Sequence, residues 1–165
     1  MIIDHIIPEN KPFNCVCLGG TFDHLHQGHK SLLKVAFKMG FHVAIGLATK
    51  ILFSHKKYHN IIQPYEVRKD AIEDYISSEL KISNYAYQFI PLEDPFGPAV
   101  ENPQIDAQIC SQETYRGCIE INKIRRKRGI KPTKIVIVPL IRDSSGEKVS
   151  STKIRTSIKN KRREK

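Results

Sequence analysis

Three histidines and three glycines lie within the stretch LGGTFDHLHQGHKS, residues 18–31. Its central spacing is H-x-G-H, with His26 and His29 on either side of the Gln27-Gly28 pair. If a helix starts near Gln27, both imidazoles lie on one face of its first turn, because residues three apart are neighbours on a helix. The free N–H groups and positive dipole end of such a turn attract anions. We therefore predict a phosphate-binding site here, with Gly28 letting a phosphate or a planar base approach the backbone.

The turn before this helix supplies further polar groups. Thr21 and Asp23 follow Gly20 and suit helix capping, metal binding or hydrogen bonds to a ligand. His24 is best explained as a residue that serves the loop itself. Zinc held by the three histidines is the competing interpretation, since imidazole is a common zinc ligand. No carboxylate or cysteine occupies an obvious position for a fourth ligand, so no resident metal is expected.

A second group of polar residues lies near the C-terminus, in VSSTKIR, residues 149–155. Ser150, Ser151 and Thr152 stand at another predicted helix start, where hydroxyl residues commonly act as N-caps. Arg155 follows in the first turn and can donate two parallel hydrogen bonds to a phosphate. Together with the histidine loop, these residues predict a second anion-binding surface.

Two common phosphate motifs are absent from the sequence. The run Gly19-Gly20-Thr21 does not continue as the G-x-G-x-x-G of dinucleotide-binding proteins. In GHKS, residues 28–31, a histidine separates the glycine from the lysine and the glycine spacing does not fit a P-loop. An ordinary kinase or GTPase is therefore not expected.

Apolar runs and helical periodicities alternate along the chain. Runs rich in β-branched residues predict strands, and apolar residues three or four apart predict helices. Strands that alternate with helices imply right-handed crossovers and a parallel sheet covered on both faces. We therefore predict an α/β fold, a single doubly wound (Rossmann-like) domain with a five-stranded parallel sheet that binds ligands at the carboxyl ends of its strands. Strands are expected at 13–20, 41–49, 85–92, 105–111 and 134–140, and helices at about 27–39, 64–76, 112–128 and from 151 onward.

The basic residues are concentrated in two short segments. The chain has 165 residues, which is consistent with one domain, and a formal net charge of +10. Much of that charge lies in KIRRKR, residues 123–128, and in a C-terminal tail at 159–165 that we expect to be flexible. A nucleic-acid-binding module is therefore the non-enzymatic alternative. No recognisable nucleic-acid-reading motif accompanies these runs, so nucleic acid is not expected as a partner.

Membrane and disulfide features are not predicted. No apolar run reaches the length of a membrane span, and the N-terminal MIIDHIIPENKPF makes a poor signal peptide, which favours the cytoplasm. Cys15, Cys17, Cys110 and Cys118 are expected to be reduced residues of the core. The sequence gives no prediction of an oligomeric state.

The motifs together resemble a known superfamily. GTFD followed by H-x-G-H, with a late SSTxxR, is similar to the nucleotidyltransferases that move an adenylyl or cytidylyl group from a nucleoside triphosphate. The segment PLEDPFGPAVENPQIDAQICSQETYRGCIEINKIRRKRG, residues 91–129, resembles more narrowly the phosphopantetheine adenylyltransferases of the archaeal and eukaryotic type. The resemblance runs from about Cys17 to Ile158. It implies adenylyl transfer from ATP, bound with Mg²⁺, to 4'-phosphopantetheine, giving dephospho-coenzyme A and pyrophosphate.

The resemblance also implies roles for individual residues. The phosphate of the acceptor attacks the α-phosphorus of ATP directly, so catalysis is positioning plus charge stabilisation. His29 is the candidate transition-state stabiliser, His26 holds triphosphate oxygens, and Thr21 with the Phe22 backbone contacts both substrates. The residues expected to bind the departing β- and γ-phosphates are Ser150, Ser151, Thr152 and Arg155. Gly20, Thr21, Phe22 and Gly28 complete the set expected to bind ATP.

The acceptor side is assigned in the same way. Glu113, Thr114 and Tyr115 match a motif of this branch, with helix capping or loop closure as their alternative roles. The same scaffold also adenylylates FMN or NMN and transfers cytidylyl groups to phosphorylated polyols and cholines, and these acceptors are the alternative. The residues expected to contact the acceptor phosphate are Lys50 or Lys57, and Arg68. The bacterial enzymes bind pantetheine with an arginine-rich segment that this chain lacks, and Arg116 or Arg125 is expected to replace it.

Overall fold

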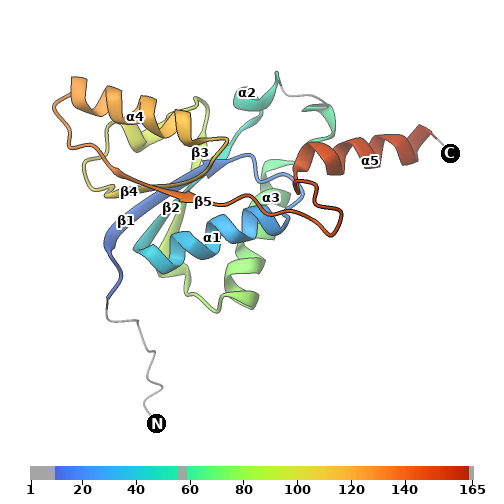
Figure 1. Ribbon diagram of the computed structural model, residues 1–165, viewed down its shortest axis with the longest axis horizontal. Coiled ribbons are helices and arrows are strands. Elements are labelled where there is room, and N and C mark those ends of the chain that lie inside the picture. Colours follow the sequence, from blue (N-terminus) through green and yellow to red (C-terminus); the bar gives the residue numbers. More distant parts are fainter. Residues whose placement is uncertain (1–9, 56–58, 164–165) are drawn as a thin grey trace, which may run out of the picture.

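A parallel sheet forms the centre of the molecule (Figure 1). The computed structural model describes residues 10–55 and 59–163. Within these residues the sheet has five strands in the order β3-β2-β1-β4-β5, all parallel, which confirms the predicted fold class. The strand order reverses between β1 and β4, where doubly wound sheets bind ligands. The strands are β1 (Phe13–Gly20), β2 (Gly40–Ala48), β3 (Tyr87–Leu92), β4 (Ala107–Ser111) and β5 (Lys134–Val138).

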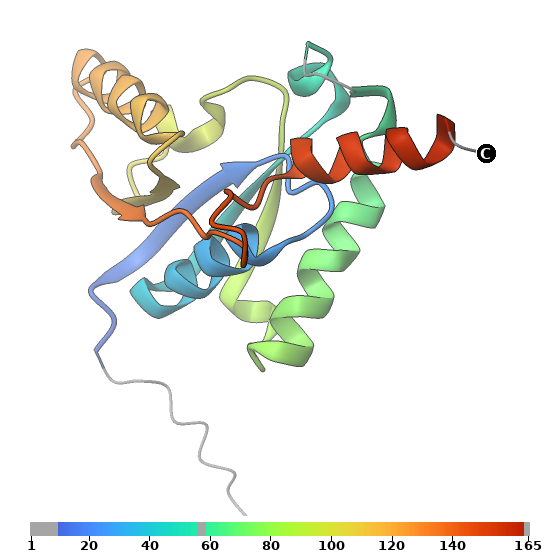
Figure 2. The ribbon, with the colours of Figure 1, turned by 45° about the vertical axis from the view of Figure 1, so that its right-hand side comes forward.

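Helices cover both faces of the sheet. Alternate residues of β1 point to opposite sides, and the apolar ones on each side are buried by the helices there. Val16 and Leu18 face the larger core, which α1 (Gln27–Met39) and α3 (Tyr65–Asp74) complete. Cys15 and Cys17 face a smaller core beside α4 (Tyr115–Lys127) and the 97–105 segment. Figure 2 shows α1 and α3 on the opposite side of the sheet from α4. The remaining elements are α2 (Lys50–Phe53), α5 (Ser151–Arg163), 3₁₀ turns at His59–Ile61, Asn84–Ala86 and Gly97–Val100, and a π-helical turn at Tyr75–Glu79.

Element boundaries differ from the predicted ones where side chains bond locally. Residues 84–86 form a 3₁₀ turn in which the Ser83 side chain accepts a hydrogen bond from Tyr85 N, so β3 begins later than expected. The side chain of Thr114 accepts a hydrogen bond from the Ser111 backbone, and α4 starts only after that turn. Residues 159–163, which the sequence predicts to be part of a flexible tail, continue α5 to Arg163. Lysine and arginine are good helix formers, which is consistent with a helix through this basic segment.

The four cysteines are free thiols. Cys110 and Cys118 are buried as predicted, but Cys15 and Cys17 are only partly buried. No helix in the described part of the chain is both long and apolar enough to cross a bilayer.

Arg125 is a structural residue of α4 and is 1% exposed. Its Nη1 donates to the carbonyl oxygens of Ala99 and Asn102, at 2.7 and 2.8 Å, and its Nε donates to Lys131 O at 2.8 Å. Its Nη2 donates to Ile105 O at 3.4 Å. The expectation that Arg125 binds the acceptor is therefore corrected, because its guanidinium holds the 99–105 segment and the chain after α4 in place.

Replacement of Arg125 by methionine tests this structural role. We expect the free energy of unfolding to fall by about 3 kcal/mol, since several buried carbonyl groups lose their donor at once. The measurement is equilibrium denaturation by urea. Lys123→Met is the matched control, because Lys123 lies on the exposed face of the same helix and pairs there with exposed Glu120. A loss below about 1 kcal/mol for Arg125→Met would contradict this role.

Candidate active site

A cavity of about 410 Å³ lies at the carboxyl ends of β1, β4 and β5, and we call it the histidine cavity. It is bounded by the loop after β1, the start of α1 and the start of α5. Thus the structure brings the two predicted anion-binding segments, 124 residues apart at His26 and Ser150, onto one surface. All the residues predicted to bind nucleotide or to act in catalysis line it: Gly20, Thr21, Phe22, His26, Gly28, His29, Ser150, Ser151, Thr152 and Arg155.

The two motif histidines hold each other in a fixed orientation. His26 is the N-cap of α1, and its Nδ1 accepts a hydrogen bond from Gly28 N at 3.1 Å. Its ring stacks on that of His29, with the ring centroids 3.7 Å apart, and the Phe22 ring packs against His29 from 5.2 Å. A Cβ on Gly28 would lie 3.0 Å from the His26 ring. Gly28 therefore makes room for the His26 ring, and its N–H is bonded to His26 Nδ1.

His26 is held as a neutral imidazole that can donate. Burial lowers its pKa, the charge of Lys148 lowers it further, and the carboxylate of Asp23 acts in the opposite direction. Since Nδ1 accepts the capping bond, the ring proton of the neutral form lies on Nε2. This N–H is suited to donate to a phosphate oxygen.

Asp23 joins three segments below the histidine cavity and is fully buried. Its Oδ2 accepts a hydrogen bond from Arg155 Nη1 at 2.8 Å, and its Oδ1 accepts one from Gln63 N at 2.9 Å. Its backbone oxygen accepts a hydrogen bond from Ser151 Oγ at 2.7 Å. Asp23 thus connects the loop after β1 to the approach to α3 and to the start of α5.

The structure shows the hydrogen-bond partners of two arginines that were expected to bind phosphate. Arg155 lines the histidine cavity, but its Nη1 is paired with buried Asp23 and its Nη2 donates to Thr152 Oγ1 at 3.2 Å. Arg68 is 1% exposed and donates to the carbonyl oxygens of Thr21, Ala48 and Gln63 at 2.6 to 2.9 Å. Arg68 therefore fixes the backbone of Thr21 and does not present its guanidinium to an acceptor.

The loop after β1 adopts an uncommon backbone conformation. Phe22 and His24 have φ angles of 51° and 46°, which is the left-handed region that side chains disfavour. Gln63 holds this turn, because its Oε1 accepts a hydrogen bond from His24 N at 2.8 Å while its own N–H donates to Asp23. His24 serves the loop in this way, and it lines neither cavity described here. Among the described residues, no three His, Cys, Asp or Glu side chains gather as a metal site.

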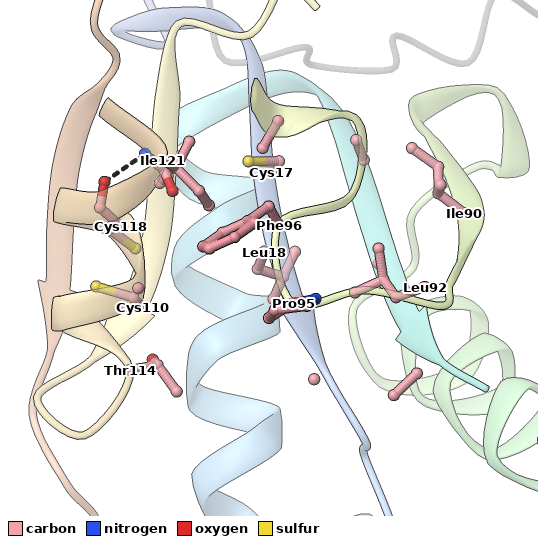
Figure 3. A pocket seen from close by; sticks show the side chains of 18 of the residues that line it. Cys17, Leu18, Ile90, Leu92, Pro95, Phe96, Cys110, Thr114, Cys118 and Ile121 are labelled. Atoms are coloured by element: carbon pink, nitrogen blue, oxygen red, sulfur yellow. Dashed lines mark hydrogen bonds between the residues drawn. The ribbon is translucent and has the colours of Figure 1, made fainter. Parts of the chain in front are cut away.

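A second cavity of about 400 Å³ adjoins the first, and we call it the apolar cavity (Figure 3). The two cavities share Gly20, Thr21 and Thr114 as parts of their walls. Figure 3 shows Phe96 between the α4 side, with Cys118 and Ile121, and the β3 side, with Leu92.

The DPFGP segment forms one wall of the apolar cavity. Asp94 Oδ1 accepts hydrogen bonds from the N–H groups of Phe96 and Gly97, both at 2.8 Å. Gly97 has a φ of 53°, and a Cβ there would lie 2.5 Å from the Leu92 side chain. This turn therefore requires glycine and directs Phe96 over the cavity.

The remaining predicted residues are dispersed. Glu113 lines the histidine cavity and Thr114 lines both. Lys50, Tyr115 and Arg116 are exposed and line neither cavity. Lys57 lies outside the described residues.

Sequence reasoning missed two ionisable residues that border the cavities. Lys148 lines the histidine cavity, and His55 lines the apolar one. Lys148 directly precedes the VSST segment, and this position was the signal that could have identified it. His55 carries no comparable signal, because only the path of the chain after α2 brings it to the cavity.

Comparison with known proteins identifies the family. The cytidylyltransferase-like family matches residues 17–157. A phosphopantetheine adenylyltransferase of Pyrococcus horikoshii is 39% identical over 150 residues, covering 90% of this chain and 92% of that one. The enzyme of the same name from Methanopyrus kandleri is 38% identical over 146 residues, or 88% and 91% of the two chains. A solved structure of an Archaeoglobus fulgidus protein of unknown function superposes with a TM-score of 0.65 at 27% identity, covering 74% of this chain and 87% of that one.

These relatives share most of their length with the chain, and the matched region contains both anion-binding segments and the walls of both cavities. The chain therefore belongs to the cytidylyltransferase-like family of nucleotidyltransferases and, within it, to the phosphopantetheine adenylyltransferases.

Proposed function

We infer that this protein transfers an adenylyl group from ATP to 4'-phosphopantetheine, giving dephospho-coenzyme A and pyrophosphate, a step of coenzyme A synthesis. The observation that carries this inference is the pair of adjoining cavities that share Gly20, Thr21 and Thr114. Because the same residues line both cavities, substrates bound in the two cavities lie next to each other at these residues. A direct transfer between them requires this proximity. The named relatives support this choice of substrates.

The histidine cavity is proposed to bind ATP. The positive ends of α1 and α5 both face it, and such helix ends favour phosphate groups. Ser150 Oγ accepts a hydrogen bond from Lys153 N, and Thr152 Oγ1 accepts one from Arg155. Each of these hydroxyls still has its own proton to donate to a phosphate, whereas Ser151 donates its proton to Asp23 O.

The apolar cavity is proposed to bind the pantetheine arm of the acceptor. Its walls are mainly aliphatic, aromatic and thiol side chains, including Leu92, Phe96 and Cys118. A largely uncharged chain ending in a thiol suits such walls better than a sugar or a charged nicotinamide ring, which would lose hydrogen bonds to water there. FMN, NMN and phosphorylated polyols are therefore the less suitable acceptors.

The reaction follows as a single in-line displacement. An oxygen of the acceptor phosphate forms a bond to the α-phosphorus of ATP, and the bond from that phosphorus to the bridging oxygen of the β-phosphate breaks. Pyrophosphate leaves with the electron pair of that bond, so no enzyme nucleophile is needed. Negative charge on the oxygens around the α-phosphorus is proposed to be stabilised by His29, with His26 holding the triphosphate. Because the ring of His29 is packed between His26 and Phe22, it does not need to reorganise during the reaction.

Mg²⁺ is proposed to enter with ATP. Among the described residues no cluster of carboxylates gathers to hold such an ion alone, and Asp23 is bonded to Arg155 and Gln63. Triphosphate oxygens and water would therefore be its main ligands, as is common for this ion. When bound, it would offset phosphate charge. Because ATP is the donor, we place the activity in the cytoplasm, and nucleic acid is not a proposed partner.

Turnover with a panel of acceptors tests the proposed function. We expect pyrophosphate release from MgATP with 4'-phosphopantetheine and none with FMN, NMN or glycerol 3-phosphate. Gly117→Leu supplies a matched variant, because Gly117 borders the apolar cavity and a Cβ there meets no atom within 4 Å. It should raise the KM for the acceptor at least tenfold, by filling the cavity, and leave ATP affinity unchanged. Turnover of a mononucleotide but not of phosphopantetheine would refute the assignment.

Substitution of the motif histidines separates their roles. His29→Ala should lower kcat by about 10²–10³ with little change in ATP affinity, because its donor acts on charge that develops in the transition state. His26→Asn should mainly raise the KM for ATP, since asparagine keeps the helix cap but lacks the Nε2 donor. His24→Asn is the control, because asparagine tolerates the left-handed backbone and His24 lines neither cavity. Equal losses of kcat for all three variants in steady-state kinetics would contradict these roles.

A further inference from the structure

An ion pair spans the mouth of the histidine cavity. Lys148 Nζ contacts Glu113 Oε1, and both residues line the cavity. Glu113 belongs to the turn between β4 and α4, whereas Lys148 precedes the serines at the start of α5. The two side chains are 36% and 54% exposed. An ion pair this exposed contributes little to stability, so a stronger ligand can separate it.

The backbone of Lys148 is fixed by a hairpin. Lys148 forms an antiparallel bridge with Arg142, and Asp143 N donates to Glu147 O at 2.8 Å. The carboxylate of Asp143 accepts a hydrogen bond from Lys153 of α5 at 2.8 Å. Hydrogen bonds from Lys153 and Ser145 hold the pKa of Asp143 well below its usual range, so this anchor stays charged. Lys148 is thus positioned at the cavity, and among the described residues its side chain is bonded to an exposed carboxylate.

Of the described residues that line the histidine cavity, Lys148 is the cation whose partner is exposed. Among the residues that line it, Lys148 and Arg155 carry full positive charges. Arg155 is paired with fully buried Asp23, and removing it from that carboxylate would leave a buried charge without its partner. Lys148 lies close enough to His26 to contribute to the lowering of its pKa, after burial. A triphosphate near His26 is therefore within the field of Lys148.

We propose that Lys148 is a phosphate-binding residue that Glu113 holds at the cavity mouth and that exchanges this carboxylate for the triphosphate when ATP binds. This proposal rests on the proposed function, because it deepens the assignment of the histidine cavity to ATP. It also gives Glu113 of the branch motif a role, as the counter-ion that keeps the cavity mouth neutral before the nucleotide arrives. Glu113 and the triphosphate then compete for the same ammonium group.

Opposite effects of the two partners on ATP binding test the exchange. Lys148→Met should weaken the Kd for MgATP about tenfold, since a charged donor to phosphate is lost. Glu113→Gln should lower the Kd by about two- to fivefold, because ATP no longer has to break the exposed ion pair, and the free energy of such a pair corresponds to a change of this size. The measurement is isothermal titration calorimetry without acceptor. A purely structural ion pair predicts that both variants change the Kd in the same direction, and that result would overturn the proposal.

Two controls separate phosphate binding from a general effect on the fold. Lys148→Met should leave the Kd for AMP within about twofold, because the exchange requires the β- and γ-phosphates; an equal loss for AMP and ATP would overturn the proposal. Lys123→Met and Glu120→Gln break another exposed ion pair, on α4 away from both cavities, and should change neither Kd. Because binding is measured without turnover, a wild-type protein that binds ATP but transfers nothing to phosphopantetheine would refute the proposed function alone.

Discussion

The buried ion pair between Asp23 and Arg155 is the constraint on which the site depends. It joins the loop after β1 to the last helix, 132 residues further along the chain, and both side chains are almost completely removed from solvent. Breaking such a pair by removing one partner leaves an uncompensated charge in the interior, which typically costs about 3–5 kcal/mol. Ser151 adds a hydrogen bond to Asp23 O at the same point. The two anion-binding segments therefore form one cavity only when α5 is docked on the loop.

The same contact explains how the unusual loop geometry is maintained. Left-handed backbone at Phe22 and His24 is unfavourable by itself and persists only where the surroundings hold it. Asp23, between them, is bonded to α5 and to Gln63, and the carbonyl oxygen of Thr21, two residues upstream, accepts a hydrogen bond from Arg68. The result is a rigid turn that precedes the motif histidines, which line the histidine cavity. Electrostatic stabilisation of a transition state needs this kind of preorganisation.

Much of the architecture could be predicted from the sequence. Periodicity located the five strands and the helices α1, α3, α4 and α5, though not the short α2, and the rule for doubly wound sheets placed the candidate site at the end of β1. The partners of the arginines could not be predicted, because an arginine in the sequence looks the same whether it faces a phosphate or a carbonyl group. Arg68 and Arg125 bond backbone oxygens far away in the sequence, and these contacts exist only in the folded chain. Lys148 was not predicted as a site residue, since an isolated lysine in a sequence is usually a surface residue.

A double-mutant cycle on Asp23 and Arg155 tests most directly whether their ion pair assembles the site. The measured quantity is kcat/KM for pyrophosphate formation from MgATP and 4'-phosphopantetheine, in Asp23→Asn, Arg155→Met and the double variant. We predict that each single substitution lowers kcat/KM by about 100-fold. The kcat/KM of the double variant should lie within about threefold of that of the less active single variant, because both substitutions remove the same interaction. Losses that multiply in the double variant would contradict this, since they would mean that Arg155 binds phosphate independently of Asp23.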